Sequence, residues 1–305
     1  MPDVLTALVD AASARGATYA DARSVEREHE AVSLRDGQVE GVTRTADRGV
    51  GFRVIHQGAW GFAATDRTGE AAMRGLVDEA FARAAASAST RSKPVALAPI
   101  APQGGEYRTT LTRDPFAVPM KERIALLTAA DAALTGPNAK SRRASVAAYR
   151  TRKRLVTSEG TDVTQEVVES GAGVAVTAAK GGARPAQRYD SRLTRQAGWE
   201  FVEELDLVAR AARYREDAEA TLDAPLATER PTTLVFAPEF LALLVHESCG
   251  HPTEADRVLE YEVAFAGTTF MWPKDRGQLR YGSEHINMTA DATVPGGMGT
   301  FGWDD

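Results

Sequence analysis

The sequence predicts an α+β fold: an antiparallel sheet with helices packed on it, followed by the start of a β-rich domain that carries a His-Glu helix. Three observations support this prediction. Runs rich in β-branched and aromatic residues are joined by short turns such as Asp36-Gly37, which is typical of hairpins. Amphipathic segments with helical spacing interrupt those runs. A polar linker separates a predicted N-terminal α+β domain, residues 1–223, from a partial second domain, residues 231–305.

In the first part of the chain, helices are expected on either side of a group of short strands. Val4–Arg15 is apolar along one side and ends at Gly16, as an amphipathic helix does. Gly69–Ala86 is an Ala-rich helix, with Thr68 as its candidate N-cap. The strands expected between these helices are Asp21–Glu28, Ala31–Arg35, Val39–Thr43, Gly49–Ile55 and Ala59–Ala64, with hairpin turns at Asp36-Gly37 and Gln57-Gly58.

The later part repeats this alternation after a proline-rich segment. Residues 91–119 combine several prolines with adjacent glycines, which predicts a crossing loop. Helices are expected at Pro119–Leu134 and Leu205–Leu222, on either side of a second group of strands. The strands expected from here on are Ser145–Thr151, Arg154–Thr157, Asp162–Glu169, Gly171–Thr177 and Thr232–Phe236. From Ala264 onward, short apolar pieces between Gly and Pro indicate hairpins and loops.

Composition narrows the class of protein. The 305 residues are 43% hydrophobic and 26% charged, which is ordinary for a globular protein. A formal net charge of −6 argues against a nucleic-acid partner, because phosphate neutralisation supplies much of that affinity. No apolar run approaches the roughly 20 residues of a membrane span, and the N-terminus does not resemble a signal peptide. The single cysteine, Cys249, excludes an internal disulfide framework. We therefore expect a cytoplasmic protein.

The stretch Leu241–Glu254, LALLVHESCGHPTE, places two of the five histidines beside a carboxylate. In the common HExxH zinc motif, the histidines stand four residues apart on one helix face. Here His251 follows His246 by five residues, which in a regular helix separates them by about 140°. A π-bulge would return both to one face. Alternatively, the helix ends near Gly250, because Gly250 permits unusual backbone angles and Pro252 disfavours helical angles at His251.

Spacing alone leaves two interpretations of this stretch. In one, an apolar helix carries two zinc ligands and a general base into a dry site, as zinc hydrolases do. In the other, the stretch is a buried helix with two incidental histidines, because HExxxH is not the standard zinc pattern.

Residues 246–256, HESCGHPTEAD, resemble the HExxxH segment of the PmbA/TldD metallopeptidases, specifically of the TldD-type subunit. Glu254 and Asp256 fall where that pattern has acidic residues. Residues 47–63 are similar to the family's N-terminal hairpin, and residues 291–305 to its Pro-Gly-rich loop with paired aspartates. The resemblance implies a cytoplasmic zinc peptidase that acts on unfolded, short or modified peptides. It also implies a homo- or heterodimer with another PmbA/TldD-type subunit.

Motif and resemblance together give the polar side chains expected roles. His246 and His251 would bind Zn²⁺ as neutral imidazoles. Glu247 would act as the general base that takes a proton from the zinc-bound water and passes it to the leaving amine. Glu254 is a possible additional ligand, or a carboxylate that supports a ligand from behind. If the metal interpretation fails, Glu247 is an ordinary exposed carboxylate on a helix.

A catalytic zinc normally has three protein ligands, and only two are evident here. The resemblance implies that the third is a cysteine in the C-terminal part of the full-length protein, which we expect to lie beyond Asp305. Cys249 lies inside the helix between the two histidines and is interpreted as a buried, inert thiol. The remaining candidates are weaker: Asp256, Glu260, His285, His29 and His56.

The loop Thr293–Gly299, TVPGGMG, is a candidate substrate contact. We expect Thr293, Pro295, Gly296 and Gly297 to offer backbone to an extended peptide that pairs as an added strand; the alternative is a plain turn. For the whole chain, a zinc peptidase competes with two other hypotheses. One is a non-catalytic peptide-binding or assembly module, such as a truncated or inactive subunit. The other is a structural metal helix without hydrolysis.

Overall fold

The computed structural model describes residues 3–67, 69–190 and 193–304. An antiparallel sheet with helices packed on it confirms the predicted α+β class. Contacts divide the chain into two units, Met1–Ala224 together with Asp291–Asp305, and Pro225–Ala290. The first unit contains every strand of the described residues, and the second contains the His-Glu helix. The predicted second domain, residues 231–305, is therefore shared between the two units.

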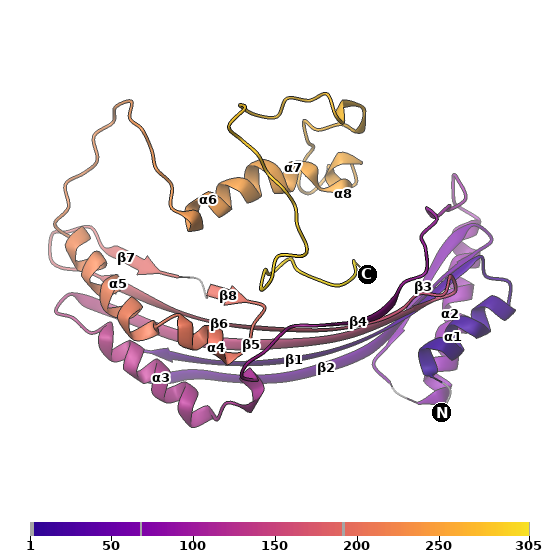
Figure 1. Cartoon of the computed structure of the whole chain (residues 1–305), viewed down its shortest axis with the longest axis horizontal. Coiled ribbons are helices and arrows are strands. Elements are labelled where there is room, and N and C mark those ends of the chain that lie inside the picture. The colour runs from indigo at the N-terminus through magenta and orange to yellow at the C-terminus, as the bar shows by residue number, and fades with distance from the viewer. Residues whose placement is uncertain (1–2, 68, 191–192, 305) are drawn as a thin grey trace. The chain divides into compact units, whose positions relative to one another are not determined.

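The sheet has eight strands in the order β3-β2-β1-β5-β6-β4, with β7 and β8 also paired to β6 (Figure 1). Neighbouring strands are antiparallel, except that β4 runs parallel to β6. The strands are β1 (Tyr19–Arg35), β2 (Gln38–His56), β3 (Ala59–Thr65), β4 (Gly104–Arg108), β5 (Ala139–Thr157), β6 (Asp162–Ala178), β7 (Ala186–Tyr189) and β8 (Leu193–Arg195).

Four strands are longer than the segments predicted for them. β1 joins the two runs expected on either side of His29-Glu30, and β2, β5 and β6 each join two predicted runs in the same way. The connecting residues include no Gly, Pro or Asn, so nothing in the backbone interrupts the ladder of hydrogen bonds. Both predicted hairpin turns are confirmed. Asp36-Gly37 has φ values of 50° and 83°, and Gln57-Gly58 has 52° and 70°, as a type I′ turn requires.

The helices of the first unit form two hydrophobic clusters on one face of the sheet, near its two ends (Figure 1). Along β1, Ala20 and Ala22 belong to one cluster, and Val32 and Leu34 to the other. Because side chains alternate along a strand, these four share a face. The helices are α1 (Val4–Ala14), α2 (Glu70–Ala88), η1 (Pro115–Ala117), α3 (Met120–Ala133), α4 (Trp199–Glu204) and α5 (Leu207–Thr221).

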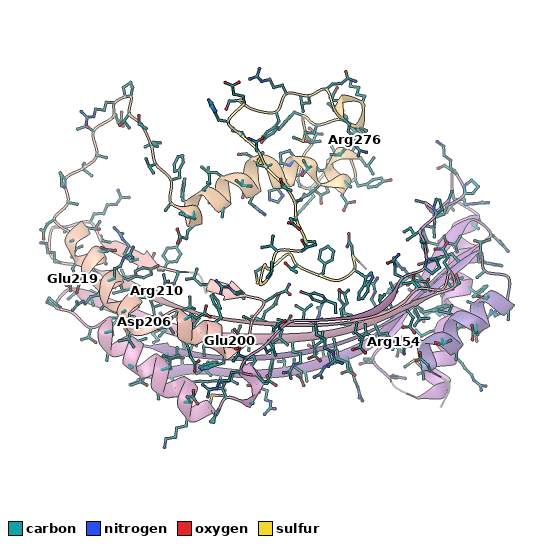
Figure 2. The ribbon with its side chains drawn as sticks, in the orientation of Figure 1. Arg154, Glu200, Asp206, Arg210, Glu219 and Arg276 are labelled. Atoms are coloured by element: carbon teal, nitrogen blue, oxygen red, sulfur yellow. The ribbon has the colours of Figure 1, made fainter. Side chains whose placement is uncertain are left out.

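One prediction in the first unit needs correction, and one short helix was not predicted. The segment 91–119 is not only a loop, because Gly104–Arg108 adds β4 to the edge of the sheet as a parallel partner of β6. That pairing is non-local, so local composition could not indicate it. The helix predicted at Leu205–Leu222 is confirmed as α5, and the short helix α4, which was not predicted, ends just before it, with Asp206 between the two (Figure 2). Asp206 has a φ of 43° and its carboxylate accepts from the Ala209 N–H at 3.2 Å, so it caps α5.

The second unit also differs from its prediction. No residue of Pro225–Ala290 is in a strand, so the strand predicted at Thr232–Phe236 and the hairpins predicted after Ala264 are wrong. A strand is stable only when a neighbour takes its backbone hydrogen bonds, and no second run within this unit does so. The proposed N-cap Thr68 lies outside the described residues. Among the helices that the structure describes, none combines the length and apolarity needed to cross a bilayer.

Candidate metal centre

The His-Glu stretch lies on a continuous helical segment of the second unit. The segment begins at Pro238, which suits the first turn of a helix because that turn needs no backbone donor. Leucines and alanine then continue it as strong helix formers. The elements of the unit are α6 (Pro238–Val245), the π-helix η2 (His246–Gly250), α7 (His251–Thr253), α8 (Ala255–Val258) and η3 (Pro273–Asp275).

A π turn decides between the two backbone alternatives for the motif. The His251 N–H donates to the His246 carbonyl, five residues back, and this extra residue returns the second histidine to the face of the first. The two imidazole ring centroids lie 4.4 Å apart at 70°. Gly250 and His251 keep helical φ values of −61° and −56°, so the alternative of a helix that ends near Gly250 is wrong.

Side chains satisfy the carbonyls that the π turn and Pro252 leave without a helical donor. Pro252 has no N–H, so it cannot donate within the helix. The Tyr281 hydroxyl donates to the Ser248 carbonyl. The Thr253 hydroxyl donates to the carbonyls of Cys249 and Gly250, at 2.8 and 2.9 Å. These contacts stabilise the turn that brings the histidines together.

His246, Glu247 and His251 form a group whose potential ligand atoms all lie within 4.8 Å of one another. One Glu247 oxygen lies 3.9 Å from Nε2 of His246, and the other lies 3.8 Å from Nε2 of His251. The carboxylate of Glu247 therefore lies between the Nε2 atoms of the two imidazoles.

Glu254 contacts the opposite edge of the second imidazole. Its Oε1 lies 2.7 Å from Nδ1 of His251, while its Oε2 lies 3.7 Å from Nη2 of Arg257. A carboxylate at Nδ1 favours the tautomer with the proton on Nδ1, which leaves the Nε2 lone pair for a cation. This position suits a supporting carboxylate rather than a direct ligand.

The donor set fits zinc. Two imidazole nitrogens are ligands that catalytic zinc sites use, and the carboxylate beside them is placed as a general base. Zinc–nitrogen bonds of about 2.0–2.1 Å place two tetrahedral ligands on the order of 3.4 Å apart. The candidate ligand atoms lie within 4.8 Å of one another, so the two imidazoles must approach by at most about 1.4 Å to share one ion. The side chains of His246 and Glu247 are 59% and 58% exposed, so rotation about their χ angles can achieve this.

The other candidate ligands lie outside this group. Cys249 Sγ contacts the Tyr281 hydroxyl at 3.3 Å and is not part of the cluster. The His285 side chain is 86% exposed beside Glu284. The two N-terminal histidines contact aromatic rings in the first unit, His29 stacked on Tyr149 and His56 tilted against Phe81. Asp256 and Glu260 are likewise not members of the cluster.

The loop predicted to contact substrate belongs to the first unit. Gly296 has a φ of 74°, and its carbonyl accepts from the Gln196 N–H at 3.2 Å. The Gly297 N–H donates to the Val294 carbonyl at 3.0 Å, and both the N–H and the hydroxyl of Thr293 donate to Asp291. Backbone groups on either side of Pro295 are thus already hydrogen-bonded within the first unit, and the loop forms a turn.

The sequence interpretation missed three residues that shape these regions. Tyr281 supports the π turn from a position distant in sequence, and no local signal pointed to it. Gln165 and Gln196 are 2% and 6% exposed, and both bind the backbone of the segment Asp291–Asp305. A buried glutamine inside a predicted strand was the available signal, because buried polar groups need partners.

A helix that holds two imidazoles and a carboxylate within reach of one cation defines a candidate metalloprotein of the α+β class. The sequence also matches three consecutive domain profiles: PmbA/TldA metallopeptidase domain 1 over residues 20–87, the central domain over 113–218 and the C-terminal domain over 229–305. The chain belongs to the PmbA/TldD metallopeptidase family.

Relatives and solved structures agree with this assignment. A metalloprotease of Synechocystis sp. is 30% identical over 292 residues, 95% of this chain and 60% of the relative. A metalloprotease of Methanocaldococcus jannaschii is 24% identical over 287 residues, 94% of this chain and 61% of the relative. A Thermotoga maritima structure named as a proposed modulator of DNA gyrase has a TM-score of 0.59 at 15% identity, covering 74% of this chain and 49% of its own. That likeness shows the fold alone. The chain spans about 60% of the length of these metalloproteases.

Proposed function

We propose that this chain provides the zinc-binding helix of a TldD-type peptidase that hydrolyses peptide bonds in unfolded, short or modified peptides. The observation that carries the proposal is the π turn, which sets His246 and His251 on one face with Glu247 between their Nε2 atoms. The relatives are named metalloproteases in each case, which supports the same class of reaction.

Each side chain of the group has a defined task in this proposal. His246 and His251 would hold Zn²⁺, and a cysteine of the kind the family resemblance implies would complete the ligand set. Bound zinc would supply Lewis acidity to the scissile carbonyl and the attacking water at neutral pH. Glu247 accepts the proton of the attacking water and delivers it to the leaving amine. Glu254 keeps the proton of His251 on Nδ1, so that Nε2 remains a donor to the metal.

We further propose that the active assembly pairs this chain with a second PmbA/TldD-type subunit, identical or related. An extended peptide substrate would pair with backbone of this chain, because main-chain pairing gives affinity with broad sequence tolerance. In this proposal Thr293, Pro295, Gly296 and Gly297 contact the peptide through the few backbone groups that their own turn leaves available.

Metal content of the purified chain tests the centre directly. We expect about one zinc per chain by mass spectrometry, and its loss in His246→Ala and in His251→Ala. His285→Ala serves as the matched control, since His285 is exposed and outside the group, and should retain the metal. Absence of zinc both from this chain and from a longer chain that carries the expected third ligand would contradict the centre and favour a peptide-binding or assembly module.

Glu247→Gln separates metal binding from catalysis. Because the amide cannot accept the proton of water, turnover of an unfolded peptide should fall about 10²–10⁴-fold, while zinc content stays that of the wild type. The measurement uses the chain together with its PmbA/TldD-type partner. Unchanged turnover would show that another group acts as the base.

A further inference from the structure

A hollow of about 650 Å³ lies over β1, β2 and β3 on the sheet face opposite α1 and α2. Its lining residues Asp21 and Arg53 alternate with Ala20 and Phe52, which pack in the helix-covered cluster. The floor forms where β2 passes Gly49 and Gly51, because neither residue carries a side chain. Phe62 stands beside this floor, and a Cβ on Gly51 would lie 3.4 Å from its ring.

A buried carboxylate orients an arginine at one end of this hollow. Asp21 is 2% exposed, and its two oxygens accept from Nε of Arg53 at 2.9 and 3.1 Å. On the other side, the guanidinium lies 5.5 Å from the ring centroid of Trp60. The two Nη nitrogens of Arg53 donate to no residue that the structure describes. The guanidinium is thus held through Nε and its ring contact, with its Nη edge available.

The hollow combines this cationic edge with an apolar wall. Two parallel N–H donors of a guanidinium match the two oxygens of a carboxylate better than a point charge does. Phe62 is 51% exposed, and with Val25 and Ala64 it lines the space next to Arg53. Burying such a surface against an apolar ligand is favourable by about 25 cal/mol per Å².

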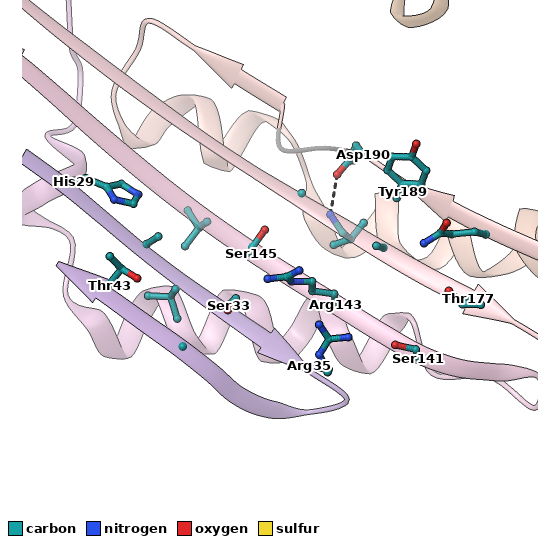
Figure 3. Close-up of a pocket in the computed structure, with 18 residues that line it drawn as sticks. His29, Ser33, Arg35, Thr43, Ser141, Arg143, Ser145, Thr177, Tyr189 and Asp190 are labelled. Atoms are coloured by element: carbon teal, nitrogen blue, oxygen red, sulfur yellow. Dashed lines mark hydrogen bonds between the residues drawn. The ribbon is translucent and has the colours of Figure 1, made fainter. Parts of the chain in front are cut away.

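The larger hollow on the same face shows a different arrangement (Figure 3). It encloses about 680 Å³, and two arginines, Arg35 and Arg143, are among its lining residues. Both ion-pair with Glu40, at 2.6 and 3.4 Å. Glu40 therefore contacts both arginines of that hollow, whereas Asp21 contacts Arg53 through Nε alone.

We propose that the hollow lined by Asp21, Arg53 and Phe62 binds a small carboxylate that carries an apolar group, the chemistry of a peptide C-terminus with an apolar last residue. Every lining residue belongs to the first unit, so this proposal does not depend on the metal centre. It assigns a ligand to the Gly-rich hairpin of residues 47–63, which the proposed hydrolysis does not use.

Calorimetric titration of the full chain tests the ligand class with three probes. N-acetyl-L-leucine carries the carboxylate and the apolar group, N-acetyl-L-leucinamide lacks the charge, and inorganic phosphate lacks the apolar group. We expect the free acid to bind at least tenfold more tightly than either of the others. Equal binding of the amide, or of phosphate, would overturn the proposal.

Variants of β2 test whether the ligand binds in this hollow. Arg53→Gln should weaken binding of N-acetyl-L-leucine at least tenfold, and Arg53→Lys should recover only part, because lysine cannot form the fork. Gly51→Val keeps the Asp21–Arg53 pair but fills the floor, and should weaken binding without altering the charges. Arg48→Gln, on the same strand and the opposite face, is the matched control and should bind as the wild type does. Wild-type affinity in both Arg53→Gln and Gly51→Val would overturn the proposal.

Discussion

Glu254 and His251 show how one contact sets the chemistry of a candidate ligand. The 2.7 Å contact between Oε1 and Nδ1 favours the tautomer with the proton on Nδ1, which leaves the lone pair of Nε2 for a cation. The imidazole is also held against rotation, although its side chain remains 31% exposed. The orientation of this candidate ligand is thus fixed by a carboxylate at its other edge.

Replacing Glu254 with Gln should weaken zinc binding about 10–100-fold, because the amide is a poorer acceptor for the Nδ1 proton than a carboxylate. Competition with a chromogenic chelator measures the dissociation constant. Asp256→Asn is the matched control, since Asp256 is a nearby exposed acid outside the group. An unchanged constant in Glu254→Gln would show that Glu254 does not support the ligand.

Arg123 is a residue whose contribution to folding stability depends on its partners. It is 1% exposed, and its guanidinium lies 2.7 Å from Glu30 and donates to the carbonyls of Pro115 and Val118 at 2.6 and 3.2 Å. Glu30 is itself 7% exposed. A buried ion pair of this kind adds little net stability over an apolar pair. Removing one member, however, leaves the charge of the other buried.

Arg123→Met should therefore lower the free energy of unfolding by about 3–5 kcal/mol, measured by urea denaturation. The double variant Arg123→Met, Glu30→Leu should recover most of that loss, because no charge is left buried. Arg213→Met, which removes an exposed arginine on α5, should remain close to the wild type. A single variant as stable as the wild type would show that Arg44, which lies 3.1 Å from Glu30, compensates the charge of Glu30 by itself.

At the scale of elements, the sheet keeps a regular register, whereas the helical segment of residues 238–253 interrupts its own. The long strands β1, β2, β5 and β6 keep an almost unbroken register, so side chains alternate faces over their whole length. The helix instead breaks its register once, at η2, and that one extra residue aligns two side chains that a regular helix would separate.

Glu169, on β6, makes the stability of the folded chain depend on pH. Among the described residues it makes no hydrogen bond or ion pair, and burial raises its pKa above the 4.5 of a free glutamate. The folded chain therefore keeps this proton at a pH where the unfolded chain has released it. Its contribution to stability is present below pH 4.5 and is lost as the pH rises through the raised pKa.

Glu169→Gln should accordingly have a higher melting temperature than the wild type at pH 7, because it removes an ionised, partly buried carboxylate. The difference should shrink as the pH falls toward 4.5, where the wild-type side chain is protonated in the folded state. Differential scanning calorimetry over this range measures it. Glu159→Gln, at an exposed turn, is the control; equal midpoints for Glu169→Gln and the wild type at pH 7 would contradict the argument.

At the scale of the whole molecule, the first unit is built from two separate parts of the chain, Met1–Ala224 and Asp291–Asp305. Gln165 binds the backbone of the segment Asp291–Asp305. Its side-chain oxygen accepts from the N–H groups of Gly302 and Trp303 at 3.0 and 3.1 Å, and its amide donates to the Trp303 carbonyl at 2.9 Å. No residue of Pro225–Ala290 is buried.

Gln165→Leu should release this segment, because an apolar side chain leaves two backbone donors without an acceptor. Hydrogen exchange at Gly302 and Trp303, followed by mass spectrometry, should accelerate at least tenfold. Gln187→Leu, at an exposed position on β7, is the control. Unchanged protection in Gln165→Leu would mean that other contacts, such as Trp303 against Gly105, hold the segment without the glutamine.

Local patterns in the sequence were enough to predict the α+β class, both I′ hairpins and most helices. A turn such as Asp36-Gly37 is specified by residues that tolerate positive φ, and a helix by its own apolar spacing. The grouping of His246, Glu247 and His251 was likewise accessible, because all three lie within two turns of one helix.

Long-range contacts decided the rest. β4 exists because β6 offers a parallel edge, and no strand forms at Thr232–Phe236 because no neighbour pairs with it. Spacing left the π turn and a broken helix equally open, and the structure selected the π turn, with Tyr281 supporting it from outside the helix. The sequence alone thus determined which residues could bind metal or turn the chain, since those properties are local. Only the tertiary structure decided which backbone groups found partners, since a hydrogen bond depends on both of its ends.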